Sequence, residues 1–199
     1  MDQYLPPGPL SSEEFTALVN RHQGALVGFL RGLVASDEQA LDLAQDVFYD
    51  AWLSARRGAS PFGRGDAPEA ARRWLFRAAY HRGISALRRR RILRWESLEF
   101  QYEQAPEAFA VADTFEDALA EREAVREALA RLAPQDVACL LLRVVQGFGI
   151  AEIGEIVGAS TEAIHKRLVR ARQRLRHSYL AQEAHPVPQA PSQKEPRSC

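Results

Sequence analysis

The stretch GIAEIGEIVGASTEAIHKRLVRARQRLR, residues 149–176, contains two apolar repeats at helical spacing, one on each side of a glycine. The expected inward faces consist of Ile150, Ile153, Val157, Ile164, Leu168, Ala171 and Leu175. Gly158 permits a sharp turn because it reaches positive φ without a Cβ clash, and Ser160 can accept hydrogen bonds from the free amides of the next helix. The spacing predicts a helix-turn-helix made of residues 150–157 and 160 to about 180.

The second helix of this pair is strongly basic on its outer side. From Lys166 to Arg176 there are six basic residues and no acidic one. Such a helix can lie in a major groove, with its first side chains at base edges and its later arginines at phosphates. A solvated basic face on an ordinary bundle helix is the alternative, but the turn, the apolar stripe and the basic face coincide. The outer side chains are Thr161, Glu162, His165, Lys166 and Arg170, followed by Arg172, Arg174 and Arg176.

The first half of the chain predicts three helices. Residues 12–57 form two of them, since SSEE at 11–14 and SDEQ at 36–39 both fit the capping box of a helix start. The segment GASPFGRGDAP at 58–68 predicts a loop, and a helical pattern returns over 69–94. The apolar row of this third helix contains Phe76, Tyr80, Ile84 and Leu87.

An acidic segment separates the two halves. Between Trp95 and Glu123 there are nine acidic residues and one base, Arg122. We interpret residues 95–115 as a linker. No alternation typical of strands appears, so the sequence predicts an all-α protein of two small helical domains joined by an acidic linker, the C-terminal domain containing the helix-turn-helix. The expected parts are a disordered N-terminus (1–11), a first domain (12–94), the linker (95–115), a second domain (116–182) and a Pro-rich disordered tail (183–199).

The second domain begins with two more helical segments. Residues 116–132 are amphipathic, and Pro134 fits the first turn of a helix. Residues 135–145 then place Val137, Leu141 and either Val144 or Val145 at helical spacing, which predicts that these side chains face inward. Glycines at 147 and 149 end the segment.

The third helix carries a second cationic surface. Between Arg72 and Arg94 there are nine arginines and no acid, interleaved with aromatic side chains. A cationic stripe with aromatics suits a DNA strand whose backbone is neutralised and whose bases stack. Exposed arginines on a packed helix are the alternative. The stripe contains Arg73, Arg77, His81, Ser85 and Arg88, with Trp74 and Tyr80 beside it.

The helix before it is acidic on one face. Asp42, Gln45, Asp46 and Tyr49 lie at spacings that bring them to one side of DLAQDVFYDAW, residues 42–52. Such a face can dock a basic partner or simply keep the protein soluble. Taken alone, the pattern favours solubility.

Composition excludes several classes of protein. The 26 basic and 26 acidic residues balance, so overall charge does not decide whether nucleic acid is a partner. No apolar run is long enough to cross a bilayer and the start lacks the regions of a secretory signal, so we expect a cytoplasmic protein that is not itself a membrane protein. Cys139 and Cys199 alone make no metal site, and Cys139 is expected to be a small core residue. We expect no cofactor, small-molecule substrate or catalytic residue, and no enzyme activity.

Taken in order, the motifs resemble those of bacterial RNA polymerase sigma factors of the extracytoplasmic-function (ECF) family. DLAQDVFYDAW is similar to the family's segment that binds core polymerase, and RRWLFRAAYHRGISALRRRR (72–91) to its promoter-melting and minus 10 segment. LARLAPQDVACLLLRVVQGFGIAEIGEIVGASTEAIHKRLVRARQRLR (129–176) is similar to its fourth conserved region, which binds the minus 35 element. The resemblance implies core RNA polymerase and promoter DNA as partners, with an anti-sigma factor as a further one.

The resemblance also assigns residues to each surface. For core polymerase they are Asp42, Gln45, Asp46, Phe48 and Tyr49. For minus 10 DNA they are Arg64, Arg73, Trp74, Arg77, Tyr80, His81, Arg82, Ser85, Arg88 and Arg89. For minus 35 DNA they are Ser160, Thr161, Glu162, His165, Lys166, Arg167, Arg170, Arg172 and Arg174.

Five positions depart from the family pattern. Leu41 replaces a common acidic residue, His81 an asparagine and Ser85 an aspartate, while Ala163 and His165 stand where threonine and lysine often occur. The promoter sequence is therefore not implied by the resemblance, because these positions are expected near bases. Two rival readings remain. A stand-alone helix-turn-helix regulator leaves the acidic and arginine-rich helices unexplained, and a nucleic-acid enzyme lacks a motif in this sequence.

Overall fold

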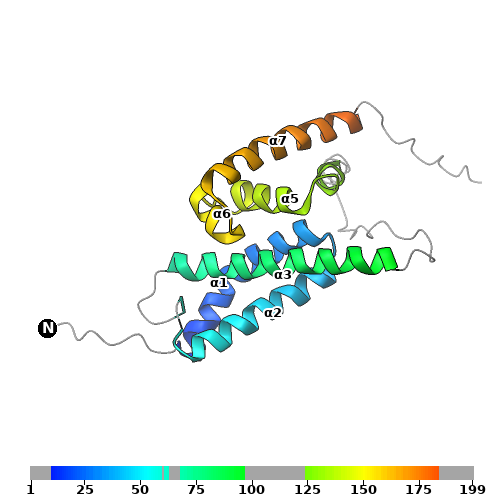
Figure 1. The fold of residues 1–199 in the computed structure, drawn as a ribbon. Helices are drawn as coiled ribbons and strands as arrows, with labels where there is room; N and C mark the ends of the chain where they lie inside the picture. Colours follow the sequence, from blue (N-terminus) through cyan, green and yellow to red (C-terminus); the bar gives the residue numbers. More distant parts are fainter. Residues whose placement is uncertain (1–9, 60, 63–67, 97–123, 184–199) are drawn as a thin grey trace, which may run out of the picture.

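The computed structural model describes residues 10–59, 61–62, 68–96 and 124–183, and within these ranges the chain is helical without strands. The N-terminal unit consists of three helices (Figure 1): α1 (Ser12–Val34), α2 (Asp37–Arg56) and α3 (Pro68–Glu96). The all-α prediction is confirmed. The linker prediction began too early, because α3 continues past residue 95 to Glu96.

The starts of α1 and α2 follow the local sequence. The hydroxyl of Ser11 accepts a hydrogen bond from the Glu14 amide while the Glu14 carboxylate accepts one from the Ser11 amide, which is a complete capping box. At α2 the hydroxyl of Ser36 accepts from the Gln39 amide at 3.4 Å. The two helices are joined by Ala35, which adopts a left-handed conformation with φ of 53°.

The three helices pack pairwise around an apolar interior. Phe29 of α1 and Phe76 of α3 meet edge to face with ring centroids 5.5 Å apart. Phe62, just before α3, is buried and contacts Trp74 edge-on at 4.9 Å. Burial of such rings removes large apolar areas from water and fixes how the helices cross.

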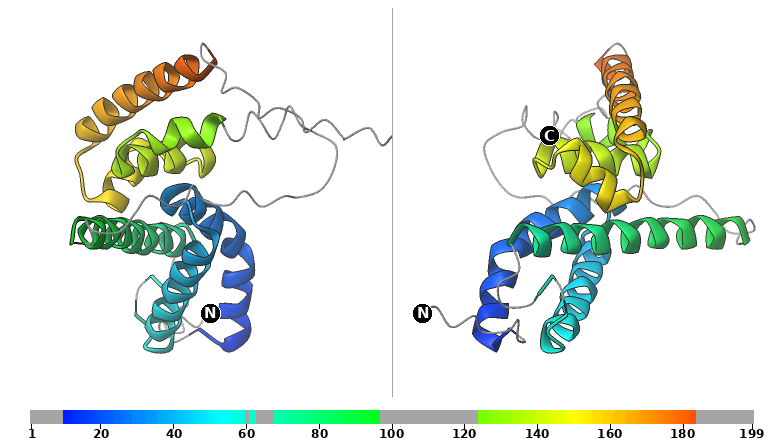
Figure 2. Two further views of the ribbon diagram at one scale, coloured as in Figure 1. Left: turned by 90° about the vertical axis from the view of Figure 1, so that its right-hand side faces the viewer. Right: turned by 60° about the vertical axis from the view of Figure 1, so that its left-hand side comes forward.

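The C-terminal unit contains a helical segment at 124–130, followed by α5 (Pro134–Leu140), the π-helix η1 (Leu141–Val145), α6 (Ile150–Val157) and α7 (Thr161–Glu183). α7 packs on α5 and α6, and α6 packs on α3 of the other unit. Figure 2 shows α7 on the side that faces away from α1, α2 and α3. The first residues of the second domain, 116–123, lie outside the described ranges.

The π-helix overturns one expectation about burial. Val144 and Val145 were expected to offer one inward side chain, yet they are 68% and 65% exposed. The Gln146 amide bonds to the carbonyl of Leu141, five residues back, so the turn holds one residue more than an α-helical turn. The extra residue shifts the apolar stripe, and Leu142 and Phe148 are buried instead.

The predicted helix-turn-helix is confirmed as α6, a tight turn and α7. Gly158 has φ of 73°, and the Ser160 hydroxyl accepts from the Ala163 amide at 3.2 Å. The turn also needs a glycine at position 154, because the space there is limited. A Cβ on Gly154 would lie 2.7 Å from the carbonyl oxygen of Ala159, so the turn can approach α6 closely only at a glycine.

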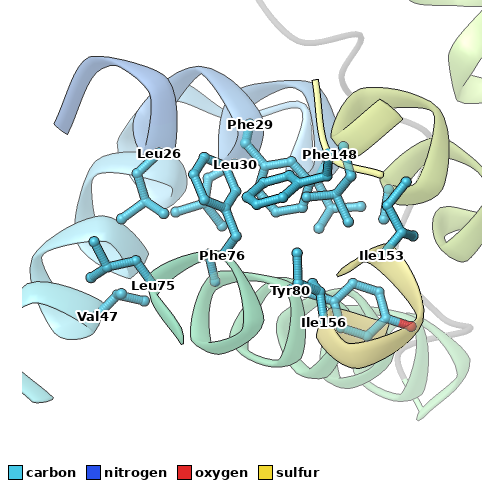
Figure 3. Packing of buried hydrophobic residues seen from close by; sticks show 14 of the residues in the cluster. Leu26, Phe29, Leu30, Val47, Leu75, Phe76, Tyr80, Phe148, Ile153 and Ile156 are labelled. Carbon is cyan, nitrogen blue, oxygen red and sulfur yellow. The ribbon is translucent and has the colours of Figure 1, made fainter. Parts of the chain in front are cut away.

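The two units share one apolar interior. Phe148, which precedes α6, is fully buried and its ring lies 5.1 Å from that of Phe76 on α3. Figure 3 shows Phe148 beside Phe29 and Phe76, with Ile156 of α6 close to Tyr80. A single cluster of buried residues therefore runs through both units.

Several expectations fall outside the described residues. They concern the N-terminus to residue 9, most of the acidic linker, Arg64 and the tail from residue 184. Among the residues described, no helix has the length and apolar character needed to cross a bilayer. Within the same ranges, no three histidine, cysteine, aspartate or glutamate side chains gather where they could hold a metal ion.

Candidate nucleic-acid interface

The outer face of α7 is open to solvent along its length. Its inner face is fixed by Ile164, Leu168 and Ala171, all buried against α5 and α6. The exposed side chains include every predicted position except one: Ser160, Thr161, Glu162, His165, Lys166, Arg170, Arg172 and Arg174 are exposed, and Arg167 is half-buried. Near the start of the helix the Lys166 ammonium pairs with the Glu162 carboxylate at 2.5 Å.

Two arginines of α7 are directed toward a buried acid instead. Asp136, in the first turn of α5, is largely buried, and its carboxylate oxygens lie 3.3 Å from Nη1 of Arg174 and 3.9 Å from Nη1 of Arg167. A buried carboxylate is costly unless it is paired, so these contacts tie α7 to α5. The arginines Arg170, Arg172 and Arg176 are exposed on α7 and lie outside this ion-pair cluster.

Part of the α3 surface is also open. Arg77, His81, Ser85, Arg88 and Arg89 are exposed on this helix, as the stripe predicts. Partial burial lowers the pKa of His81, and the nearby charge of Arg77 lowers it further. The neutral ring is therefore favoured, with one nitrogen that donates and one that accepts.

The remainder of the α3 surface is covered by the other unit. Arg73 pairs with two acids of α6, at 3.5 Å from Glu152 and 3.3 Å from Glu155. Tyr80 is only 8% exposed, and Trp74 is half-buried against Phe62. In this arrangement Tyr80 is not available to DNA, because its side chain is buried near Ile156 of α6.

Arg72 links the two units through two contacts, and sequence reasoning did not select it as a site residue. Its guanidinium lies 4.0 Å from the centroid of the Phe148 ring and donates to the carbonyl of Gln146. Gln146 in turn donates from Nε2 to the carbonyl of Ala25 on α1. A stacked, hydrogen-bonded arginine of this kind fixes orientation as well as adding attraction.

The acidic face of α2 contains the predicted side chains, and an arginine of α3 pairs with two of its acids. Asp42, Gln45, Asp46 and Tyr49 are exposed, whereas Phe48 packs against the core. Arg82 of α3 pairs with Asp46 at 3.0 Å and also with Asp50. The predicted polymerase-binding and minus 10 residues are thus joined by an ion pair.

Residues that the sequence analysis missed share a property. Arg72, Phe148, Asp136 and Gly154 each act through a partner elsewhere in the fold. Only Phe148 had a usable signal, since an aromatic residue between two glycines is more often anchored than free. The others depend on contacts that spacing along one helix does not reveal.

Known proteins are similar to this chain in sequence and in fold. Residues 122–175 match the family described as Sigma-70, region 4. The chain is 34% identical over 161 residues to the ECF RNA polymerase sigma factor SigM of Mycobacterium tuberculosis, a match that covers 81% of this chain and 74% of SigM. It is 30% identical over 146 residues to the RNA polymerase sigma factor YlaC of Bacillus subtilis, covering 70% and 76% of the two chains. This chain belongs to the ECF sigma factor family.

Solved structures agree with this sigma factor in fold. The sigma factor RpoE, solved in complex with the anti-sigma factor NepR from Bartonella quintana, superposes with a TM-score of 0.66 at 23% identity, covering 83% of this chain and 96% of RpoE. CnrH, solved with the cytosolic domain of CnrY, gives a TM-score of 0.60 at 24% identity, covering 86% and 90%. The region 4 match of this sigma factor contains α6, the turn and α7 as far as residue 175, and α1 to α3 form the separate N-terminal unit.

Proposed function

We propose that this sigma factor binds core RNA polymerase through α2, captures minus 10 DNA with α3 and reads minus 35 DNA with α7. The observation that carries the proposal is the outer face of α7. It is basic and exposed along a helix whose opposite side is buried against α5 and α6, so the helix is rigidly presented for a groove.

At the minus 35 element, the two ends of α7 have different tasks. Thr161, Glu162 and His165 lie at the N-terminal end, where a recognition helix meets base edges. Arg170 and Arg172 follow and are placed for phosphates. Each good base contact discriminates by about 1 to 3 kcal/mol, whereas phosphate contacts add affinity that falls steeply with salt.

At the minus 10 element, the proposal needs no catalytic group. Bases that leave the stack can be held by aromatic and cationic side chains, and this binding offsets an unpairing cost of a few kcal/mol, about the cost of flipping a base. Arg77, His81 and Ser85 are supported as contacts by their exposure on one stripe of α3. Substitution of Arg77 or His81 is expected to impair strand opening more than duplex binding. Permanganate reactivity of unpaired bases measures the opening.

Core docking is assigned to Asp42, Gln45, Asp46 and Tyr49. Tyr49 is 62% exposed beside these acids, and a large exposed ring with a polar tip is typical of the anchor of an interface. Arg82 holds Asp46 through its guanidinium, so it is a positioning residue for this face as well as a neighbour of the DNA surface.

The partners and location follow from this role. Promoter DNA and bacterial core polymerase are the partners, an anti-sigma protein is a further one, and the chain works in the cytoplasm where the polymerase is. RpoE, which shares the fold, was solved with an anti-sigma factor. The protein acts as a subunit that directs RNA polymerase and carries out no reaction of its own.

The test is transcription in vitro with purified core polymerase that lacks any sigma factor, followed by mapping of the start sites. Selective initiation that depends on this chain supports the proposal. A chain that neither associates with core polymerase nor starts transcription contradicts it, and operator binding without polymerase would favour a stand-alone regulator. Substitution of Glu162 or His165 should change promoter preference; a uniform loss on all promoters contradicts their role at base edges.

A further inference from the structure

One side of α7 carries three arginines in a row. Arg167, Arg170 and Arg174 follow one another at spacings of three and four residues, so they are neighbours along the same side of the helix. We call them the arginine row. It is about 10 Å long, because an α-helix rises about 1.5 Å per residue. Such a row can bind the phosphates of any duplex, since the backbone is the same whatever the bases are.

The two ends of the arginine row are already paired inside the protein. The largely buried carboxylate of Asp136, on α5, accepts a hydrogen bond from Nη1 of Arg174 at 3.3 Å and lies 3.9 Å from Nη1 of Arg167. Burial raises the pKa of the Cys139 thiol on α5, and the charge of Arg167 opposes this rise, so that guanidinium lies beside α5. Arg170, in the middle of the row, is exposed and lies outside these ion pairs.

We propose that Asp136 is a positioning residue that sets the sequence specificity of α7. It keeps Arg167 and Arg174 from the DNA backbone, and it fixes the rotation of α7 about its own axis. The inference rests on the proposed function, in which α7 reads the minus 35 duplex. Because fewer phosphates are bound, the side chains that meet base edges contribute a larger share of the binding.

The first effect of Asp136 concerns charge. Contacts to phosphates supply the affinity that does not depend on sequence. When Arg174 turns to a phosphate, it leaves a buried carboxylate with one partner fewer, which makes the new contact less favourable. Without Asp136, Arg174 is free one helical turn from Arg170 and can reach the same stretch of backbone. The carboxylate therefore lowers the affinity of α7 for DNA of any sequence.

The second effect concerns orientation. Ile164, Leu168 and Ala171 hold α7 against α5 and α6, but apolar contacts have no preferred direction. A hydrogen bond to a charged group does have one. Two arginines that lie two turns apart and reach the same carboxylate leave α7 little freedom to roll. Its rotation decides whether Glu162 and His165 meet base edges.

Asp136→Asn in the full chain tests the effect of charge. Binding to duplex DNA of random sequence is measured between about 50 and 200 mM salt. Each arginine that gains a phosphate should steepen the fall of log K with log salt by about 1, so that the loss of binding over this range grows about 3.5-fold. Glu13→Gln removes the same charge from an exposed side chain of α1, and it should leave the slope unchanged.

Further variants separate this effect from damage to the fold. Adding Arg174→Ala to Asp136→Asn should remove about 1 from the increased slope, and Asp136→Glu, which retains the charge, should return the slope toward that of the unaltered chain. A purely structural role would weaken binding without steepening the slope. Circular dichroism shows whether the helices are retained, and Asp136→Ser replaces Asp136→Asn if that variant unfolds. A folded variant without the carboxylate whose slope equals that of the unaltered chain would overturn the proposal.

The effect on specificity is measured with core polymerase bound. The holoenzyme is offered a promoter fragment found by start-site mapping and the same fragment with a scrambled minus 35 sequence. Asp136→Asn should lower the ratio of the two affinities by about fivefold or more, as the loss of one good base contact would. If the ratio is unchanged, the role of Asp136 in specificity is wrong while the sigma activity stands. If the unaltered holoenzyme does not distinguish the two fragments, the proposed reading of minus 35 DNA is wrong, and this inference with it.

Discussion

Arg172 and Arg174 are two residues apart on α7, and their surroundings differ. Arg172 is exposed on the outer face of the helix, while Arg174 pairs with the buried carboxylate of Asp136. Sequence spacing alone treats them alike, as phosphate contacts. The structure leaves Arg172 open for the proposed phosphate contact and gives Arg174 a structural partner as well.

Arg172→Ala should therefore weaken binding to minus 35 duplex on all sequences and lower the slope of log K against log salt by about 1. Arg174→Ala should change this slope less and lower the free energy of unfolding by roughly 1 kcal/mol, because a largely buried acid loses a partner that is itself mostly exposed. Binding isotherms at several salt concentrations and urea unfolding give both quantities. Equal changes of slope in the two variants would refute the distinction.

Cys139 gives a prediction about pH. Burial raises the pKa of its thiol from the ordinary 9.0 to about 11, and the charge of Arg167 opposes this only in part. Because the folded thiol holds its proton more tightly than the unfolded one, its contribution to stability is complete below pH 9 and is lost as the pH rises toward 11. In Cys199→Ser protein, the ultraviolet absorbance of the thiolate should appear well above pH 9. Titration of the folded protein at the ordinary value would show that the thiol is accessible.

At the scale of elements, the helix-turn-helix depends on how closely its two helices approach. Gly158 provides the turn through its positive φ, and Gly154 provides the space for the Ala159 carbonyl. The first requirement concerns one residue's own backbone, whereas the second concerns a neighbour across the turn. The acidic and arginine-rich helices are coupled in a similar way, since Arg82 of α3 holds Asp46 and Asp50 of α2.

Gly154→Ala is expected to destabilise region 4 by about 2 kcal/mol, because the added methyl meets a backbone atom that cannot move without shifting the turn. Gly24→Ala is the matched control, since a Cβ there meets nothing within 4 Å and alanine favours a helix. Urea unfolding of both proteins provides the comparison. A Gly154→Ala protein as stable as the control would mean that the turn can relax.

For the whole molecule, the decisive feature is that both units share one cluster of buried residues. Phe148 lies in the region 4 sequence, yet it is fully buried between Phe76 and Arg72, which are both on α3. Units that share a core unfold together as long as the contact between them is strong. The free protein should therefore unfold in a single transition.

Phe148→Ala should remove about 3 to 5 kcal/mol from the stability of the assembled chain and separate the unfolding of the two units into two steps. Phe148→Leu, which keeps an apolar side chain, should cost less and keep one step. Denaturant unfolding should be followed by tryptophan fluorescence and by circular dichroism. The fluorescence reports on the N-terminal unit, because all three tryptophans (Trp52, Trp74 and Trp95) lie on α2 and α3, whereas circular dichroism reports on all helices. Two steps in the unaltered protein would contradict strong coupling.

Local sequence patterns were enough to predict the helices, their caps, the helix-turn-helix and the polar face of α7. These features depend on residues within about one helical turn of one another. Their spacing along the chain is therefore enough to predict which residues interact. It also predicted the three cationic or acidic surfaces and the burial of Cys139. The π-turn at η1 escaped it, because one added residue breaks the regular spacing and exposes Val144 and Val145.

Which of these side chains are free depends on how the helices pack together. Arg72 meets Gln146 across 74 residues of sequence, and Arg73 meets Glu152 and Glu155 from the other unit. Asp136 reaches Arg174 across 38 residues. Contacts between residues far apart depend on how whole helices cross, and no local pattern contains that information. Periodicity therefore found the charged surfaces, while packing between the two units determined which part of them is open.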